Sequence, residues 1–193
     1  MTMKGEIFNM ASFEEAYKLT KKWEGGYANL TGDTGGETMW GIARNFWGDK
    51  YDLKEFWKSL DTYRDIAFAQ TNKSKSEIIE TINKLCEGNT QMVESCKKFY
   101  KKTFWDKLCG DKIKNQKVAN NLFDFNVNAG RNGTKVFQKA VGVTADGIVG
   151  PATINALNEA NNDELVDARI RYYKSLKKPQ FEKGWTNRAE DFR

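Results

Sequence analysis

The spacing of hydrophobic residues along the chain predicts a mostly helical protein. From Phe13 to Trp23, apolar residues recur at three- and four-residue steps, which is the period of one face of a helix. Ser12 followed by Glu15 has the spacing of a capping box, and Gly25-Gly26 supplies a stop signal. We therefore expect the first helix to run from Ser12 to about Glu24.

A different pattern follows this helix. Between Tyr27 and Trp40 the chain is rich in glycine and asparagine, which predicts a turn-rich excursion with two or three short strands. After Gly48 the helical period returns, with a second capping box at Ser74 and Glu77. Helices are expected at about 56–67, 78–85, 93–104, 118–129 and 134–141. Another is expected to begin at Pro151, and a final long helix at 163–176.

Composition narrows the class of protein. The chain has 193 residues, enough for one domain or for one domain with a small appended part. Its 39% hydrophobic and 13% aromatic content excludes a disordered chain, and no apolar stretch is long enough to span a membrane. Histidine is absent, which eliminates Ser-His-Asp and Cys-His catalytic sites and histidine-containing zinc sites. Any acid–base chemistry must therefore rest mainly on carboxylates.

Charge and cysteine content add two expectations. A net charge of +5 favours anionic partners, but the basic residues are dispersed, so we expect no nucleic-acid partner. Three cysteines without a Cys-x-x-Cys spacing predict free thiols rather than disulfides or a metal site. The carboxylates lack the spacing of a calcium loop, and we expect no metal and no cofactor.

Glu24 is the candidate acid. It follows Phe13, Tyr17 and Thr20 at helical spacing, so we expect it on the buried face and at the C-terminal end of the first helix. Desolvation and the negative end of the helix dipole both favour the protonated form of a carboxyl there. A carboxyl that keeps its proton near neutral pH can act as a general acid. Position alone also fits an exposed glutamate at a frayed helix end.

Asp33 is the candidate partner of Glu24. It lies nine residues downstream in a glycine-rich turn, where solvent and polar neighbours favour the ionised form. One protonated and one ionised carboxyl divide the work in glycosidases. Thr38 can position a water or a substrate hydroxyl, while Tyr27 and Trp40 offer flat surfaces to the apolar faces of sugar rings. Each of these residues also fits an ordinary turn or core role.

The motifs around these residues resemble a known enzyme family. Glu24-Gly25-Gly26-Tyr27, Asp33-Thr34-Gly35-Gly36-Glu37-Thr38 and Trp40-Gly41-Ile42 are similar to the N-terminal signature of glycoside hydrolase family 108, the predicted lysozymes (muramidases) of phages, prophages and bacterial secretion clusters. The spacing of the Glu, Asp and Thr is also similar to that of phage-type lysozymes. The resemblance implies a mainly α, lysozyme-like helical fold with a small turn-rich β excursion after the first helix.

The resemblance continues to the end of the chain. Phe104-Trp105-Asp106 and the stretches 120–130 and 137–151 resemble the predicted peptidoglycan-binding domain of this family, and Gly184-Trp185 matches its usual ending. We expect a lysozyme-like catalytic part over residues 1–103 and a helical peptidoglycan-binding part over 104–193, packed as one compact unit.

By this resemblance the chain is a peptidoglycan hydrolase that cleaves the β-1,4 bond between N-acetylmuramic acid and N-acetylglucosamine. Glu24 is the catalytic acid, assisted by Asp33 and Thr38. The expected partner is the glycan strand of peptidoglycan, bound by a monomer. The residues predicted to contact it are Tyr27, Asn29, Trp40, Phe125 and Asn128.

The chain also departs from the family pattern. Asn29-Leu30-Thr31 stands where the family commonly has Asn-Asp-Pro, and Ala43 stands where it has Thr. The stretch 48–100 is longer than the family usually shows, and we expect no catalytic role for it.

Three other functions stay open at this point. A lytic transglycosylase would use the same acid but let a hydroxyl of the substrate attack. A non-catalytic wall-binding module would use the Asp146–Pro151 loop, and a basic nucleic-acid-binding protein would bind with a steep salt dependence. The N-terminus lacks an apolar stretch typical of a signal peptide, so we expect synthesis in the cytoplasm and action on the cell wall after release or export.

Overall fold

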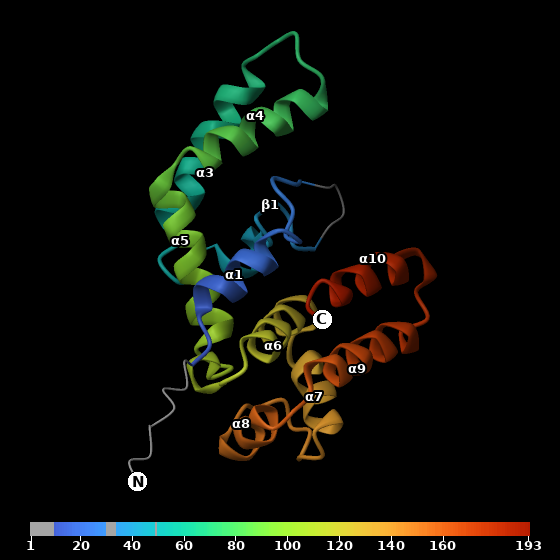
Figure 1. Cartoon of the computed structure of the whole chain (residues 1–193). Coiled ribbons are helices and arrows are strands. Elements are labelled where there is room, and N and C mark those ends of the chain that lie inside the picture. Colours follow the sequence, from blue (N-terminus) through green and yellow to red (C-terminus); the bar gives the residue numbers. More distant parts are fainter. Residues whose placement is uncertain (1–9, 30–33, 49) are drawn as a thin grey trace. The chain divides into compact units, whose positions relative to one another are not determined.

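The computed structural model of the chain describes residues 10–29, 34–48 and 50–193. It is 66% helical, with ten α-helices and one two-stranded sheet in the described part, which confirms the mainly α prediction (Figure 1). The chain divides into two units, one of Lys21–Lys102 and one of Met1–Thr20 with Thr103–Arg193. No helix of the described residues is long and apolar enough to cross a lipid bilayer.

The unit of Lys21–Lys102 combines a small hairpin with three long helices. Its longer helices α3, α4 and α5 pack against one another. The predicted capping box is present at the start of α4, where Ser74 accepts from the Glu77 N–H and Glu77 accepts from the Ser74 N–H at 2.8 Å. The elements are β1 (Thr38–Met39), β2 (Ile42–Ala43), α2 (Arg44–Trp47), α3 (Lys54–Phe68), α4 (Lys75–Glu87) and α5 (Thr90–Tyr100).

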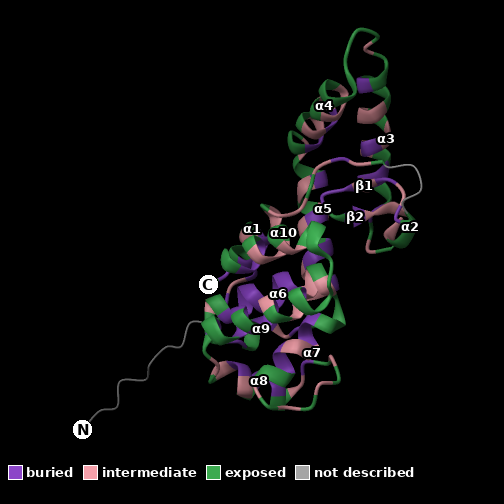
Figure 2. Cartoon of the chain, turned by 90° about the vertical axis from the view of Figure 1, so that its right-hand side faces the viewer, coloured by how far each residue is buried: buried purple, intermediate pink, exposed green. Residues whose placement is uncertain are grey.

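The core of this unit is aromatic. Phe56 and Trp57 pack edge to face with ring centroids 4.9 Å apart, and Phe99 packs on Trp47 at 5.1 Å. The end of α3 is different, because Phe68 is 59% exposed. In Figure 2 the loop that joins α3 to α4 is mostly green, which marks exposed residues. The apolar stripe of α3 is therefore buried over only part of its length.

The second unit contains the remaining helices. The first of them ends at Lys21, earlier than the sequence predicts, and the Ser12 N–H donates to Gln116 at 2.6 Å rather than to Glu15 of the expected capping box. A further helix, α10, was not predicted; Pro179 occupies its first turn, where a missing N–H costs nothing. The elements that lie wholly or mostly in this unit are α1 (Phe13–Lys21), the π-helix η1 (Lys101–Trp105), the 3-10 helix η2 (Gly110–Lys112), α6 (Gln116–Ala129), α7 (Arg131–Ala140), α8 (Pro151–Asn158), α9 (Asn162–Ser175) and α10 (Pro179–Glu190).

Helix α6 forms the centre of this unit. Every residue from Val118 to Phe125 is buried, as expected for a helix that is covered on all sides (Figure 2). The rings of Phe13, Trp105 and Phe123 meet in a cluster with all three centroid distances at 5.8 Å. This cluster fixes α1 against α6.

A buried ion-pair cluster ties α6 to α9 and α10. The Asp124 carboxylate is fully buried and accepts from Arg169 and, at 2.7 Å, from Nη2 of Arg188. Arg169 also donates to Asn121 at 3.1 Å, and its guanidinium lies 4.9 Å from the centre of the Phe125 ring. Because burying a charge without a partner is costly, these contacts make Asp124 essential to the unit.

We predict that Asp124→Asn lowers the free energy of unfolding by about 3–5 kcal/mol, because both guanidinium groups lose the charge that compensates their burial. Urea denaturation of the full chain measures the loss. Asp167→Asn is the matched control, since it breaks an exposed pair with Arg193 and should change stability little. Equal stability losses in the two variants would contradict the role of Asp124.

Candidate active site

Glu24 lies in a turn just beyond α1. Its N–H donates to the Lys21 carbonyl at 3.3 Å, and the residue is half-buried. The sequence placed it within the last helical turn, whereas α1 ends three residues earlier. Gly25 and Gly26 follow directly, so the side chain stands on a short connection between α1 and the hairpin.

The β1–β2 hairpin turns beside the Glu24 carboxyl. Thr38 pairs with Ala43, and the two residues of the turn, Trp40 and Gly41, both have positive φ values of 51° and 77°. A two-residue turn with both φ values positive matches the natural twist of a hairpin. A Cβ at Gly41 would collide with the Glu24 carboxylate and the Tyr100 hydroxyl. The missing side chain therefore provides the space in which these two groups lie.

Trp40 and Tyr100 fix this turn. The Tyr100 hydroxyl donates to the Trp40 carbonyl at 2.9 Å, which joins the turn to α5. The Trp40 ring is buried, 6.0 Å from the Phe56 ring centre and 5.0 Å from the Lys21 ammonium. Trp40, predicted from the sequence to contact sugar, thus packs in the core and compensates the strain of a positive φ at a non-glycine residue.

Asn83 of α4 holds the loop after Glu24. Its side-chain oxygen accepts from the Tyr27 N–H at 2.7 Å. A Cβ at Gly26 would overlap the same Asn83 amide, so glycine at 26 is what permits the approach. The segment from Glu24 to Tyr27 is therefore fastened to a helix more than 50 positions away in sequence.

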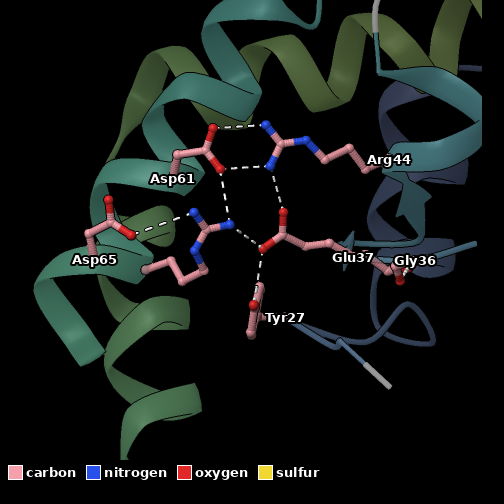
Figure 3. A network of polar contacts seen from close by, with 8 residues as sticks. Tyr27, Gly36, Glu37, Arg44, Asp61 and Asp65 are labelled. Carbon is pink, nitrogen blue, oxygen red and sulfur yellow. Dashed lines mark hydrogen bonds and ion pairs between the residues drawn. The ribbon is translucent and has the colours of Figure 1, made fainter. Parts of the chain in front are cut away.

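Glu37 is the centre of a buried polar network that the sequence analysis did not identify (Figure 3). The residue is 8% exposed, and its carboxylate accepts from the Tyr27 hydroxyl at 3.0 Å, from Arg44 at 2.6 Å and from Arg64 at 3.0 Å. Arg44 also binds Asp61 through two hydrogen bonds of 2.6 and 2.8 Å. Two carboxylates and two guanidinium groups thus balance in charge and join the hairpin to α3.

The network shifts the pKa values of its members in the directions its charges dictate. The hydrogen bond from Arg44 holds the pKa of Asp61 below its usual range, despite partial burial. Burial and the adjacent Glu37 carboxylate raise the pKa of the Tyr27 hydroxyl. Near neutral pH, Tyr27 is therefore a hydrogen-bond donor and Asp61 an acceptor.

The other predicted residues near Glu24 have different surroundings. Thr38 lies on β1 with its hydroxyl 3.4 Å from the Gly36 carbonyl, and Asn29 is exposed. Asn29 and Tyr27 line one pocket of about 280 Å³. Asp33 lies outside the described residues. Among the described residues, no cluster of three or more carboxylate or thiol groups could hold a metal ion.

Phe125 and Asn128 belong to the other unit, on α6. Phe125 is fully buried against Phe137 and Tyr173, so its ring offers no surface to a ligand. Asn128 is exposed, and its side-chain oxygen accepts from the Tyr173 hydroxyl at 2.7 Å. In this structure both residues help to hold α9 on α6.

The Asp146–Pro151 loop of this unit is held by side chains of the unit itself. The buried amide of Gln138 donates to Asp146 at 2.8 Å and to Thr153 at 3.1 Å, while its oxygen accepts from the Gly147 N–H at 2.7 Å. Gly147 has a φ of 77°, a conformation that favours glycine. The hydrogen bonds of Gln138 therefore close this loop between α7 and α8.

Comparisons with known proteins agree with this architecture. The family model described as Glycosyl hydrolase 108 matches residues 17–130, more than half of the chain. The chain belongs to glycosyl hydrolase family 108. In this family 108 chain a second model, described as a Predicted Peptidoglycan domain, matches residues 132–190. Together the two matches support a glycoside hydrolase that acts on peptidoglycan.

A solved structure is also similar to the family 108 chain. The structure of Brucella abortus SagA superposes with a TM-score of 0.59 at 27% sequence identity, covering 93% of this chain and 90% of that one. No curated protein sequence matches the chain significantly. The similarity to SagA extends over both units of the fold.

We predict that the Asp61 network of the family 108 chain loses its contribution to stability in acid. The pKa of Asp61 is lowered in the folded chain, so its contribution is complete above the unfolded pKa of about 3.9 and disappears as the pH falls through the folded value. The difference in unfolding free energy between wild type and Asp61→Asn should therefore shrink below about pH 4. Urea denaturation across this range measures it.

Asp65→Asn is the control for this experiment, since Asp65 is an exposed carboxylate on the same helix, 3.5 Å from Arg64. It should change stability little throughout. A constant difference between wild type and Asp61→Asn at all pH values would show that the network does not contribute through the ionised form.

Proposed function

We propose that the chain is a muramidase that cleaves the β-1,4 bond between N-acetylmuramic acid and N-acetylglucosamine in peptidoglycan. Glu24 is the general acid and gives its proton to the glycosidic oxygen. The observation that carries this assignment is the position of the Glu24 carboxyl, half-buried in the space left by Gly41 and next to the Tyr100 hydroxyl.

The surroundings of Glu24 supply what a general acid requires. The turn of the hairpin is tied to α5 through Tyr100, and the loop after Glu24 is tied to α4 through Asn83. The backbone on both sides of the Glu24 carboxyl is thus held in place, and correct placement of the reacting groups lowers the barrier.

Supporting roles follow from the sequence assignments. Asp33 is proposed to orient a water or to stabilise the positive charge that develops on the sugar ring, and Thr38 to position the water or a sugar hydroxyl. Tyr27 and Asn29 are proposed to contact the glycan. The peptidoglycan domain over residues 132–190 is proposed to keep the enzyme on the wall while the glycan is cut.

We predict that Glu24→Gln lowers the release of soluble fragments from purified peptidoglycan by about 10²-fold or more, because the amide cannot donate the proton. Fragment release and the thermal midpoint of unfolding are measured together. The control is Glu87→Gln, which makes the same change at an exposed position of the same unit.

Two outcomes would contradict the proposal. Lysis by Glu24→Gln at the wild-type rate would exclude Glu24 as the acid. Wild-type products that end in an anhydro sugar, seen by mass spectrometry, would show attack by a substrate hydroxyl and assign a lytic transglycosylase instead. Products with a reducing-end N-acetylmuramic acid support the muramidase.

We predict that Gly41→Ala lowers activity by about 10²-fold, because the new methyl group displaces the Glu24 carboxyl and the Tyr100 hydroxyl. Gly25→Ala is the control for the added methyl group, since a Cβ there meets no atom within 4 Å. Fragment release by the two variants is compared after both are shown to be folded by circular dichroism. Equal activity of Gly41→Ala and Gly25→Ala would show that the space at Gly41 is not required for the position of the Glu24 carboxyl.

A further inference from the structure

A pocket of about 280 Å³ begins three residues beyond Glu24, at Tyr27 and Asn29. Its other walls come from the ends of α3 and α4, which belong to the stretch for which the sequence analysis expected no catalytic role. Phe68 closes α3, while Lys75, Ile78 and Ile79 lie in the first turns of α4. The pocket thus lies between the loop after Glu24 and the pair of helices α3 and α4, called the α3–α4 hairpin below.

The lining has two kinds of chemistry. Phe68 is 59% exposed although it is a large apolar residue, and Ile78 and Ile79 are half-buried. One exposed and two half-buried apolar side chains in a single pocket match the mostly apolar lining that is typical of ligand sites. Lys75 is the single charged residue of the lining, and no carboxylate pairs with it in the part of the chain that the structure describes.

These features fit a sugar that carries both apolar groups and a negative charge. The methyl of an N-acetyl group and the flat face of a pyranose ring match the apolar walls, and the Asn29 amide can hydrogen-bond the acetamido group. A carboxylate matches Lys75, because a hydrogen bond between charged groups is stronger than one between neutral groups. A neutral N-acetylated sugar would leave the Lys75 ammonium without a partner.

We propose that this pocket binds the N-acetylmuramic acid unit of the glycan, with Lys75 recognising a carboxylate that the unit carries. That carboxylate belongs either to a free lactyl group or to the stem peptide. The proposal rests on the proposed function, because it places a specificity site for peptidoglycan beside the catalytic loop. The α3–α4 hairpin then contributes to substrate recognition, and Lys75 distinguishes muramic acid from N-acetylglucosamine.

Binding is tested by calorimetry on the full chain carrying Glu24→Gln, which prevents turnover. The ligands are chitobiose, the disaccharide of N-acetylglucosamine and N-acetylmuramic acid, and the same disaccharide with a dipeptide stem. Adding Lys75→Gln should weaken binding of a carboxylated ligand about tenfold and leave chitobiose unchanged. A loss confined to the free disaccharide assigns the lactyl group, and one confined to the dipeptide form assigns the stem. Unchanged affinity for both carboxylated ligands overturns the proposal.

Two controls separate the charge from the apolar walls. Lys84→Gln makes the same charge change nine positions further along α4, on its opposite face, and should leave all three affinities unchanged. Phe68→Ala should weaken all three ligands several-fold by removing apolar contact. Ile66→Ala is its control, since Ile66 is exposed on the same helix and does not line the pocket. Equal effects of Phe68→Ala and Ile66→Ala would exclude the apolar wall.

Turnover on purified peptidoglycan separates this proposal from the proposed function. Lys75→Gln should raise KM without lowering kcat, since it removes binding that is equal in the ground and transition states. If wild type releases fragments and Lys75→Gln has the wild-type KM, the pocket assignment fails and the muramidase assignment stands. If wild type releases no fragments, the muramidase assignment fails whatever the variant does.

Discussion

A carboxylate buried between two arginines holds the hairpin of this protein in place. Glu37 cannot leave water at low cost without partners, and it obtains them from Arg44 and Arg64, with Asp61 balancing the second positive charge. Because Arg64 and Asp61 lie on α3, the hairpin is attached to that helix by ionic contacts. The position of the Trp40–Gly41 turn, and with it the space for the Glu24 carboxyl, depends on this attachment.

The three helices between residues 54 and 100 support the Glu24 loop in different ways. Helix α3 binds Glu37, α4 supplies Asn83 to the Tyr27 N–H, and α5 supplies Tyr100 to the Trp40 carbonyl. Each contact is a single hydrogen bond or ion pair to a backbone or buried group, which fixes position more than it adds to stability. The stretch 48–100, for which the sequence predicted no catalytic role, therefore supports the candidate site around Glu24.

The unit that contains Thr103–Arg193 also joins its helices through buried polar residues, but these contacts serve the packing of that unit alone. Asp124 joins α6 to α9 and α10 through two arginines, and Gln138 closes the loop at Gly147. Several residues that give this part its family resemblance are thus engaged in internal contacts. Phe125 is also engaged in internal contacts, since its fully buried ring packs in the core and offers no surface to a ligand.

The sequence by itself determined most of the helices, a small β excursion after the first helix, the Ser74 cap and the family, because these depend on local period, turn chemistry and motif order. Local predictions failed where α1 stops at Lys21 and where the Ser12 N–H donates to Gln116 instead of Glu15, and helix α10 from Pro179 was not predicted. Only the tertiary structure revealed the partners of Glu37, the approach of Asn83 and the core position of Trp40. The physical reason is that a charge or an amide finds its partner through packing between residues 10 to 60 positions apart, which no local pattern encodes.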